Sequence, residues 1–259
     1  MEEVARRQPM DLSISIVSHL QAGMVALLLN DLFSFCRERE FEVILTLNLA
    51  EAIPFETAIY PFSIRIIRNE KPLGFGANHN QAFAMSSGKF FCVLNPDIRL
   101  SMDPFGPLLS LLEQEDIGLV APAVTNVRGE FEDSARCFPT PRGILLKTLK
   151  LPEEPDYLLA DIPISPDWTA GMFMLLPRSV YAQLGGFDVS YFLYYEDVDF
   201  CARIRLSGYR VAVTPVVRVI HNAQRRSHRN IRFLYWHVRS MLRFFMSPVY
   251  KALKSRGRA

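Results

Sequence analysis

The segment YFLYYEDVDF, residues 191–200, places three carboxylates among apolar side chains. Burying an unpaired carboxylate is strongly unfavourable, so Glu196, Asp197 and Asp199 must find partners or do chemistry. Acids this close together repel one another, and repulsion with partial burial raises the pKa of at least one of them toward that of a useful base. Alternatively, they begin a helix, where the helix dipole favours carboxylates. Capping alone does not readily explain the aromatic residues that precede them.

Asp199 has a different expected role from its neighbours. It follows Asp197 by two positions and therefore points to another face of a helix. Arg203 lies four residues further on, which is the spacing of a helical ion pair. We expect Asp199 and Arg203 to form a structural salt bridge.

A second candidate is VLNPDI, residues 93–98, at the end of a nearly continuous apolar run that predicts a strand covered on both faces. Asp97 is well placed there to hold a divalent cation on phosphates, and Pro96 restricts the backbone in front of it. Asn, Pro and Asp are also common turn formers, so the motif on its own favours a simple turn.

A glycine pair occurs in KPLGFGANHNQAF, residues 71–83. Gly74 and Gly76 would allow close approach of a ligand, and a helix N-terminus follows. The segment is not a dinucleotide fingerprint, because His79 stands where the third glycine is needed. The alternative is that Asn78 is a simple helix cap.

The segment RVIHNAQRRSH, residues 218–228, carries further candidates. His221 follows a strand and could be a metal ligand, and Arg225 and Arg226 could bind a diphosphate together with Ser227. A lone histidine at a strand end is also commonly a hydrogen-bonded turn residue. Three further histidines are expected to be structural or surface residues, namely His79, His228 and His237.

Strands and helices alternate along the chain. Strands are predicted at 12–18, 41–47, 62–68, 90–95 and 117–122, and helices at 22–40, 78–88 and 104–115. This alternation predicts an α/β sandwich with a mostly parallel sheet, whose ligands bind beyond the carboxyl ends of the strands. From about residue 125 to 167 we expect a hairpin and long loops. Order returns with strands at 171–177, 209–215 and 216–222 and helices at 178–186 and 196–208.

The composition indicates a globular protein. The chain has 259 residues, of which 49% are hydrophobic, enough for one large domain or two small ones. No apolar run approaches the roughly 18 residues that span a bilayer, and the N-terminus lacks the apolar core of an export signal. The four cysteines are widely spaced, so we expect buried thiols in a reducing compartment, which fits the cytoplasm.

The net charge of +2 hides a strong asymmetry. Residues 1–199 carry 15 Lys and Arg against 27 Asp and Glu, whereas residues 200–259 carry 14 Lys and Arg and no acid. Such a basic end indicates an anionic partner, with folding back onto the acidic body as the alternative.

Residues 230–246 predict a basic amphipathic helix. Arg232, Arg239 and Arg243 share a face with Trp236. A broad apolar face opposes them and is formed by Ile231, Leu234, Tyr235, Val238, Leu242 and Phe245. Such a helix can lie on an anionic membrane, or it can pack on the body with its arginines in water, and the sequence leaves both open.

In their order along the chain these motifs resemble family-2 glycosyltransferases, most closely the bacterial rhamnosyltransferase-like branch that builds surface polysaccharides. The resemblance runs from about residue 12 to residue 245. It is carried by NEKPLGFGANHNQAF, FCVLNPDIRL, RCFPTP, DWTAGMFMLLPRSVYAQ and VIHNAQRRSH. The most specific part is GGFD…YYEDVDFCARIRLSGYRV, residues 185–211.

The resemblance implies a GT-A type fold, which is a Rossmann-like nucleotide-binding sandwich with a mostly parallel mixed sheet, here with a C-terminal amphipathic helical segment. We divide the chain into a catalytic domain at 1–222 and a basic helix and tail at 223–259. Within the catalytic domain, the nucleotide-sugar half is expected at about 12–122 and the acceptor half at about 123–222.

The resemblance also implies the site residues of an inverting sugar transfer. Asp197, paired with Glu196, is the implied base for the acceptor hydroxyl, and Asp97 and His221 are implied ligands of a divalent cation, Mg²⁺ or Mn²⁺. The implied donor-binding residues are Ser18, His19, Thr46, Asn48, Gly74, Phe75, Asn80, Asn95, Asp97, Gly171, Arg225 and Arg226. The implied acceptor-binding residues are Trp168, Tyr191, Tyr194 and Tyr195, with Phe192 in the same aromatic wall.

Two residues depart from the pattern of the family. Asn95 stands at the first acid of the D-x-D-type motif, which leaves Asp97 as its sole carboxylate. Leu47 stands where an aspartate that binds the nucleotide base is usual, so base recognition must use Thr46, Asn48 or backbone groups.

These observations predict a cytoplasmic glycosyltransferase, peripheral on the inner face of the cell membrane. It would take a rhamnose-like sugar from a dTDP- or UDP-sugar and pass it to a surface-glycan or lipid-linked acceptor. The alternative is a non-catalytic nucleotide-sugar-binding relative in a glycan-assembly complex, although the presence of both Glu196 and Asp197 speaks against it. A nucleic-acid partner is not expected, because core-type apolar residues interrupt the basic end.

Overall fold

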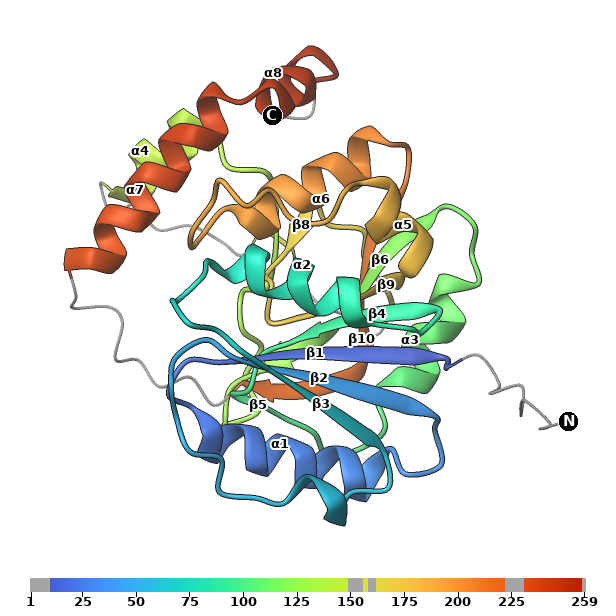
Figure 1. The fold of residues 1–259 in the computed structure, drawn as a ribbon. Coiled ribbons are helices and arrows are strands. Elements are labelled where there is room, and N and C mark those ends of the chain that lie inside the picture. The colour runs from blue at the N-terminus through green and yellow to red at the C-terminus, as the bar shows by residue number, and fades with distance from the viewer. Residues whose placement is uncertain (1–9, 149–155, 158–161, 222–230, 258–259) are drawn as a thin grey trace, which may run out of the picture.

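An eight-stranded mixed β-sheet runs through the centre of the protein (Figure 1). The computed structural model describes residues 10–148, 156–157, 162–221 and 231–257. Across the sheet the strands follow the order β3 (Ser63–Arg68), β2 (Phe41–Leu47), β1 (Leu12–Ser18), β4 (Phe90–Leu94), β9 (Phe173–Pro177), β6 (Ile117–Thr125), β10 (Arg210–His221) and β5 (Ile98–Arg99). Within this sheet β9 and β5 run antiparallel to their neighbours, and the other neighbouring strands are parallel. The predicted α/β fold with a mostly parallel sheet is confirmed.

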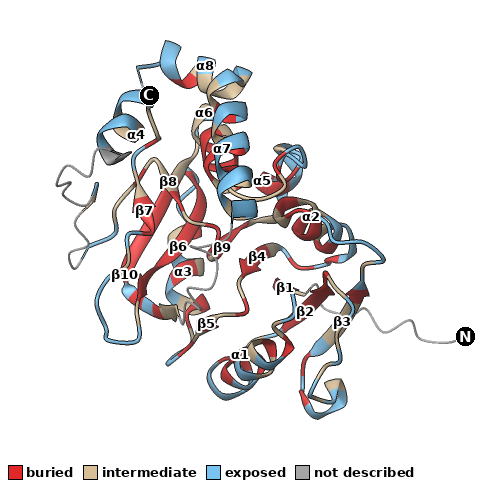
Figure 2. Cartoon of the chain, turned by 90° about the vertical axis from the view of Figure 1, so that its left-hand side faces the viewer, coloured by how far each residue is buried: buried red, intermediate tan, exposed pale blue. Residues whose placement is uncertain are grey.

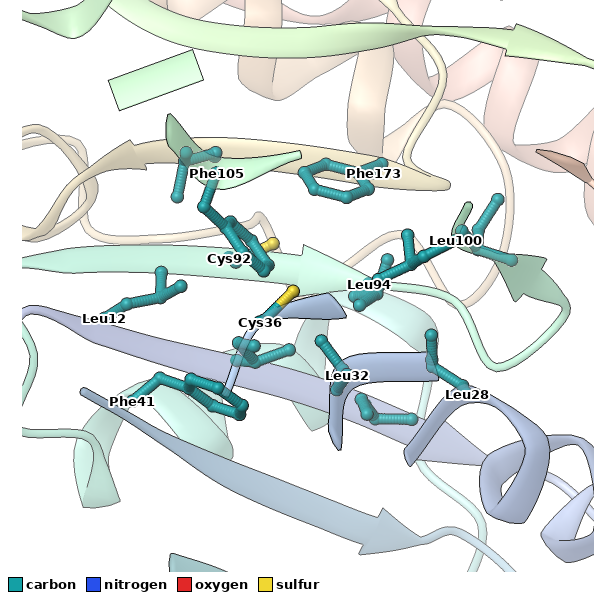
Figure 3. Close-up of a cluster of buried hydrophobic side chains, with 14 of the residues drawn as sticks. Leu12, Leu28, Leu32, Cys36, Phe41, Cys92, Leu94, Leu100, Phe105 and Phe173 are labelled. Atoms are coloured by element: carbon teal, nitrogen blue, oxygen red, sulfur yellow. The ribbon is translucent and has the colours of Figure 1, made fainter. Parts of the chain in front are cut away.

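Helices cover both faces of the sheet. One face is covered by α1 (Ala22–Phe35) and α3 (Phe105–Leu112), and the other by α2 (Phe75–Met85), α5 (Arg178–Gln183) and α6 (Glu196–Leu206). Successive residues of a strand point to opposite faces, so each central strand contributes to two cores. Leu94 and Phe173 join the core beneath α1 and α3 (Figure 3), whereas Val93 and Met174 join the core on the other face.

The segment after β6 holds a small second sheet and a helix. β7 (Ala135–Arg136) pairs antiparallel with β8 (Trp168–Thr169), but a helix lies between them in the chain, so this pair is not the hairpin that the sequence predicts. The sequence does not predict α4 (Pro141–Thr148) or the 3₁₀ turn at Thr57–Ile59.

Two C-terminal helices form a further layer over α6. The predicted amphipathic helix is confirmed as α7 (Ile231–Met246), and α8 (Pro248–Ser255) follows it. Phe244 of α7 and Leu253 of α8 join a buried cluster with Val198 and Ala202 of α6. In the parts of the chain that the structure describes, no helix is long and apolar enough to cross a membrane.

The boundaries of α2 differ from the prediction. The helix begins at Phe75 with Gly74 as its cap, so Asn78 lies inside the helix and is not its N-cap. It ends at Met85, before the expected stop at Gly88. Gly88 lies against β1 instead, where an added Cβ would be 2.6 Å from a backbone nitrogen.

The end of the sheet also differs from the prediction. The two strands expected at 209–215 and 216–222 are one strand, β10. Its pairing with β6 shifts register between Thr214 and Arg218, and such an irregularity bends a strand.

Three of the four cysteines and one histidine are buried as predicted. Cys36, Cys92 and Cys201 are buried thiols, whereas Cys137 is exposed, which corrects the expectation for that residue. His79 is also buried, and its Nδ1 lies 2.8 Å from the Ser15 hydroxyl. Burial lowers the pKa of His79 to about 3, so this ring is neutral and its role is structural.

Asp199 and Arg203 form the predicted ion pair, with 2.7 Å between Oδ2 and Nε, and the carboxylate is almost fully buried. We expect Asp199→Asn to lower the free energy of unfolding by roughly 1–3 kcal/mol, because it leaves a partly buried guanidinium without its counter-charge. The melting temperature in thermal unfolding measures the effect.

Asp116→Asn is the matched control, since Asp116 pairs with Arg210 on the surface. Surface pairs are screened by solvent and contribute little. If both variants lose the same amount of melting temperature, the buried pair of Asp199 and Arg203 contributes no more to stability than a surface pair.

Candidate active site

The candidate site lies at the carboxyl ends of the parallel strands, which we call the ligand edge of the sheet. The segment in front of β9 meets the strand ends there. The N–H of Asn95, just after β4, donates to the carbonyl oxygen of Met172 (2.9 Å). The N–H of Gly171 donates to Oδ2 of Asp197 at the start of α6 (3.1 Å). The chain in front of β9 therefore holds the NPD turn and the acids of α6 at the same edge, which is where ligands of such sheets bind.

Asp97 and His221, the two predicted metal ligands, lie side by side. Ile98 pairs with His221 in the antiparallel contact of β5 with β10, and this pairing brings Asp97 to the end of β10. The Nε2 atom of His221 lies 3.3 Å from Oδ2 of Asp97, and its Nδ1 lies 2.7 Å from Oε2 of Glu132. Burial lowers the pKa of His221, but the two carboxylates outweigh burial and raise it to about 9.

The atoms around Asp97 fit a hard divalent cation. Oδ1 of Asp97 is buried without a hydrogen-bond partner in the described structure, so this oxygen has unused capacity to bind a cation. Glu132 orients the His221 ring from the far side, as outer carboxylates do for ligating histidines. Among the residues described, no group of three or more His, Cys, Asp or Glu side chains could hold a metal ion. Asp97 and His221 would therefore need oxygen atoms of a bound ligand to complete a coordination shell.

Glu196 and Asp197 occupy different environments. Glu196 is buried, and its Oε2 has no partner within the described part of the chain. Burial and the adjacent charge of Asp197 raise the pKa of Glu196 well above its ordinary range. Burial raises the pKa of Asp197 too, but hydrogen bonds from the N–H groups of Gly171 and Val198 (2.9 Å) oppose this shift. Asp197 is partly exposed, and it is the acid of the pair that accepts backbone hydrogen bonds favouring its charged form, although its pKa stays above the ordinary value.

The backbone in front of the acids is strained. Tyr194 and Tyr195 have φ angles of 68° and 66°, a left-handed conformation that is unfavourable for bulky residues. Ser240 of α7 supports this turn, because its hydroxyl donates to the carbonyl oxygen of Leu193 (2.8 Å). The turn lets α6 begin with both acids at the sheet edge.

The glycine pair serves packing against this same loop. An added Cβ would be 2.6 Å from the Phe192 carbonyl oxygen at Gly74 and 2.5 Å from the Phe187 Cβ at Gly76. The N–H of Phe75 donates to the Phe192 oxygen (2.9 Å). In this structure the close approach that these glycines allow is to the chain itself, and the donor-binding role of Gly74 stays a prediction.

α7 covers two aromatic residues expected in the acceptor wall. Tyr191 is 1% exposed and Tyr195 is 8% exposed, and the Tyr195 ring packs on Phe244 with 5.7 Å between centroids. Rings buried under a helix offer no open wall, so these two predicted acceptor contacts are corrected to packing contacts. Tyr194 and Trp168 are partly exposed and stay candidates.

Asparagine side chains build the edge above β1 and β2. Asn48 accepts from the N–H of Leu73 (2.8 Å) and donates to the carbonyl oxygen of the same residue (3.0 Å). Asn69 donates to Asn48 (2.9 Å) and to Asn78 (2.7 Å). His19 is exposed beside them, 3.3 Å from Asn48. Asn48 therefore shapes the loop that leads into α2 and keeps His19 at the predicted donor side.

Ser18 takes part in a capping arrangement at α1. Its hydroxyl donates to Oε1 of Glu51 (2.5 Å), and Oε2 of Glu51 accepts from the N–H of Ala22 (2.9 Å). Glu51 thus satisfies a free amide at the helix N-terminus, where its charge is favourable.

The other predicted donor residues divide into two groups. Gly171 and Phe75 lie next to the acids, since an added Cβ at Gly171 would be 3.3 Å from the Phe75 ring and 3.6 Å from Cβ of Asp197. Thr46 is wholly buried in β2, and Asn80 accepts hydrogen bonds from the Tyr181 hydroxyl and the Phe187 N–H. The Asn80 side chain is therefore engaged inside the protein, whereas the Thr46 hydroxyl has no hydrogen-bond partner among the described residues. Arg225 and Arg226 lie outside the described residues.

Sequence reasoning missed the two loop carboxylates, Glu132 and Glu51. Glu132 reaches His221 because its loop turns back on β6, where its N–H donates to the carbonyl oxygen of Val124 (2.8 Å). A carboxylate in an irregular loop follows no period, so its partner is visible only once the loop is folded. The acidic run around Glu132 was the one available signal.

Solved structures with a similar fold include glycosyltransferases. GalNAc-T7, crystallised with UDP, GalNAc and Mn²⁺, aligns over 85% of this chain and 44% of its own, with a TM-score of 0.67 and 15% identity. The mannosyltransferase PcManGT from Pyrobaculum calidifontis, in complex with GDP-Man and Mn²⁺, aligns over 96% of this chain and 68% of its own, with a TM-score of 0.62 and 17% identity. The fold is therefore of the GT-A glycosyltransferase type.

Sequence similarity places the chain within that class. Residues 16–173 match Glycosyl transferase family 2. Rhamnosyltransferase WbbL of Escherichia coli (strain K12) is 30% identical over 190 residues, which cover 66% of this chain and 69% of WbbL. The N-acetylglucosaminyl-diphospho-decaprenol L-rhamnosyltransferase of Mycobacterium tuberculosis (strain ATCC 25618 / H37Rv) is 27% identical over 212 residues, which cover 73% of this chain and 69% of that protein. The chain belongs to glycosyl transferase family 2 and is rhamnosyltransferase-like.

The buried Glu196 should make stability depend on pH. Because its pKa is raised by burial, the folded protein holds a proton that the unfolded chain releases, so the contribution of Glu196 to stability falls as pH rises above the ordinary glutamate range. We expect Glu196→Gln, which stays neutral, to melt about 2–5 °C higher than wild type near pH 8, a gain on the order of 1 kcal/mol. The gain should disappear near pH 4.

Thermal unfolding of wild type and variant across this pH range measures the difference. Glu38→Gln, at an exposed position, is the control and should follow wild type at each pH. A gain for Glu196→Gln that does not change with pH would contradict a protonated Glu196 in the folded protein.

Proposed function

We propose that the protein is an inverting glycosyltransferase. It would move a sugar, with a rhamnose-like sugar favoured, from a nucleoside-diphosphate sugar to a hydroxyl of a bacterial surface-glycan or lipid-linked acceptor. The observation that carries the proposal is the pair of contacts in front of β9. Gly171 holds Asp197, and Met172 holds Asn95, so a base candidate and a diphosphate-binding candidate lie at one edge.

Asp197 would act as the general base. A sugar hydroxyl is a poor nucleophile until its proton can leave, and a carboxylate within hydrogen-bond reach can accept that proton as the oxygen attacks the sugar carbon. The amides of Gly171 and Val198 hold the carboxylate in position and favour its charged form. Glu196 is buried behind Asp197, and its raised pKa favours the neutral form, so it would add no second negative charge near the attacking oxygen.

Asp97 and His221 would hold a divalent cation, Mg²⁺ or Mn²⁺, against the donor diphosphate. Such a cation neutralises the charge that develops on a leaving diphosphate. The buried, unpartnered Oδ1 of Asp97 supports this assignment from the structure of this chain. The solved neighbours were crystallised with Mn²⁺ and either UDP or GDP-Man, which supports a nucleotide-sugar donor with a metal. A dTDP- or UDP-sugar is the donor we propose.

The proposed acceptor and sugar rest on the relatives. Two of them are named rhamnosyltransferases, and the mycobacterial one is named for a lipid-linked diphospho-sugar. The partly exposed rings of Trp168 and Tyr194 are the aromatic surfaces left for stacking on an acceptor sugar.

The base assignment is tested by Asp197→Asn, which keeps the shape of the side chain but cannot accept the proton. We expect the transfer rate to fall about a hundred- to ten-thousand-fold, the usual contribution of general-base assistance, with donor affinity almost unchanged. Transfer is measured as release of nucleoside diphosphate with acceptor present, and donor affinity by calorimetry.

Glu196→Gln is the comparison variant, since it removes an adjacent carboxyl group. A milder loss is expected for it if Asp197 is the base. Full loss in Glu196→Gln with near-normal turnover in Asp197→Asn would move the base to Glu196. Normal turnover in both variants would refute catalysis by this pair, and no turnover by wild type with any nucleotide-sugar would favour a non-catalytic binding protein.

The metal assignment is tested by Asp97→Ala. We expect donor affinity in the presence of Mn²⁺ to fall at least about tenfold, as the loss of a charge contact of roughly 1.4 kcal/mol would produce. A chelator should weaken binding to wild type but change little in Asp97→Ala. The control is Asp116→Ala, an exposed position in front of β6, at the opposite edge of the sheet. Wild-type affinity that is equal with and without chelator would rule out the metal.

A further inference from the structure

α7 has three distinct faces, one more than an ordinary amphipathic helix. The inner face contacts the loop in front of the acids. Trp236 stacks on Phe192 with 4.5 Å between centroids, and Ser240 donates to the carbonyl oxygen of Leu193. Phe244 is fully buried against the body. The helix is therefore anchored, and of the broad apolar face that the sequence shows its anchoring uses Phe245, which packs on Tyr250 with 5.0 Å between ring centroids.

The other five residues of that broad apolar face point to solvent. Figure 2 shows exposed residues along much of α7. We call the exposed apolar residues the outer stripe, and they recur at helical spacing over four turns. Their exposed fractions run from 40% to 81%, and they are Ile231, Leu234, Tyr235, Val238, Leu242 and Met246. The large aliphatic residues of a packing helix are normally its buried ones, so this arrangement is the reverse of the expected one.

The outer stripe lines a groove of about 840 Å³ on the surface. Its other wall is formed by the end of α7, the turn into α8 and the loop at Asp188 and Tyr191. A contiguous exposed apolar surface usually marks a site where another molecule docks, whereas single exposed apolar residues are normal.

Arginines border the outer stripe on one side. At 100° per residue, Arg239 and Arg243 fall between the stripe and the inner face. Both are exposed, and their guanidinium groups lie over the rings of Trp236 (5.5 Å) and Tyr191 (5.9 Å). Exposed Lys251 and Lys254 follow on α8, and residues 200–259 contain no acid. Apolar and cationic groups therefore stand side by side on the same helix.

We propose that the outer stripe docks in the plane of an anionic lipid bilayer, with its apolar side chains in the acyl boundary and its arginines at the headgroups. A helix of 16 residues that carries arginines is too short and too polar to span, but it has the pattern of an interfacial helix. Tyr235, which is exposed in the stripe, is of a residue type that prefers this boundary.

A bilayer suits this surface better than the other anionic partners. Nucleic acid would satisfy the arginines, but it would leave the aliphatic stripe against phosphates and water. A second copy of the chain docked through the same face would bring its own Arg239 and Arg243 close to those of the first, and like charges repel. Lipid alone offers negative headgroups and apolar chains within a few ångströms of each other.

Docking through the outer stripe would also orient the candidate active site. The inner face of the same helix holds the loop that carries Leu193 and leads to Glu196 and Asp197. The catalytic edge would therefore keep a constant position relative to the lipid surface. The docking itself does not depend on the proposed sugar transfer.

The experiment is flotation of the purified full chain with vesicles of phosphatidylcholine alone or with 30% phosphatidylglycerol. We expect wild type to bind the anionic vesicles and to be released by high salt, because screening weakens surface charge attraction. Val238→Gln with Leu242→Gln should weaken binding at least about tenfold at all salt concentrations. Arg239→Gln with Arg243→Gln should weaken it roughly twentyfold at low salt, and little at high salt.

The matched control is Val127→Gln with Leu27→Gln, which changes two apolar side chains of comparable exposure away from α7 and should bind as wild type does. All the substituted residues are exposed, and unchanged melting temperatures would show that the variants fold. The proposal is overturned if wild type does not bind anionic vesicles, or if the stripe variant binds them equally well. It is also overturned if the stripe variant only converts a dimer to a monomer in sedimentation, or only loses binding to an oligonucleotide.

Discussion

The hydrogen bond from the Gly171 amide to the Asp197 carboxylate is the contact on which the candidate site depends. It joins the segment in front of β9 to the first turn of α6, two parts of the chain that lie on different layers of the fold. A carboxylate beside an apolar core needs such a donor to stay charged. Glycine at position 171 leaves room for the Phe75 ring, since an added Cβ would lie 3.3 Å from it and require the ring to shift slightly.

The strained turn before α6 is held from two sides. α2 donates a backbone hydrogen bond to Phe192, and α7 donates a hydroxyl hydrogen bond to Leu193. Left-handed conformations at two consecutive tyrosines persist only where surrounding contacts over-determine them. α7 is therefore part of the support for the acids, although it follows the sheet by several residues and lies outside it. The same helix therefore supports the turn in front of the candidate base and presents apolar side chains to solvent, so it would connect the candidate site with the proposed lipid-docking surface.

The two candidate metal ligands are brought together by a very short strand. Asp97 and His221 are 124 residues apart in sequence, and a strand of two residues brings them within 3.3 Å. The pairing of Ile98 with His221 sets that distance, and no propensity rule predicts a two-residue strand after an Asn-Pro-Asp turn. Glu132 completes the arrangement from a loop with no periodic pattern.

The sequence by itself determined the layer architecture, the pairing of Asp199 with Arg203 and the position of the acids at the start of a helix. These features follow from local periodicity and spacing, which are read within a few turns of chain. The tertiary structure alone decided which residues face the site. Tyr191 and Tyr195 are covered by α7, Gly74 and Gly76 admit the chain's own loop, and the apolar face of α7 points outward. The physical reason is that a helical period shows which residues share a face, but only packing against distant segments determines whether that face meets the core, a ligand or solvent.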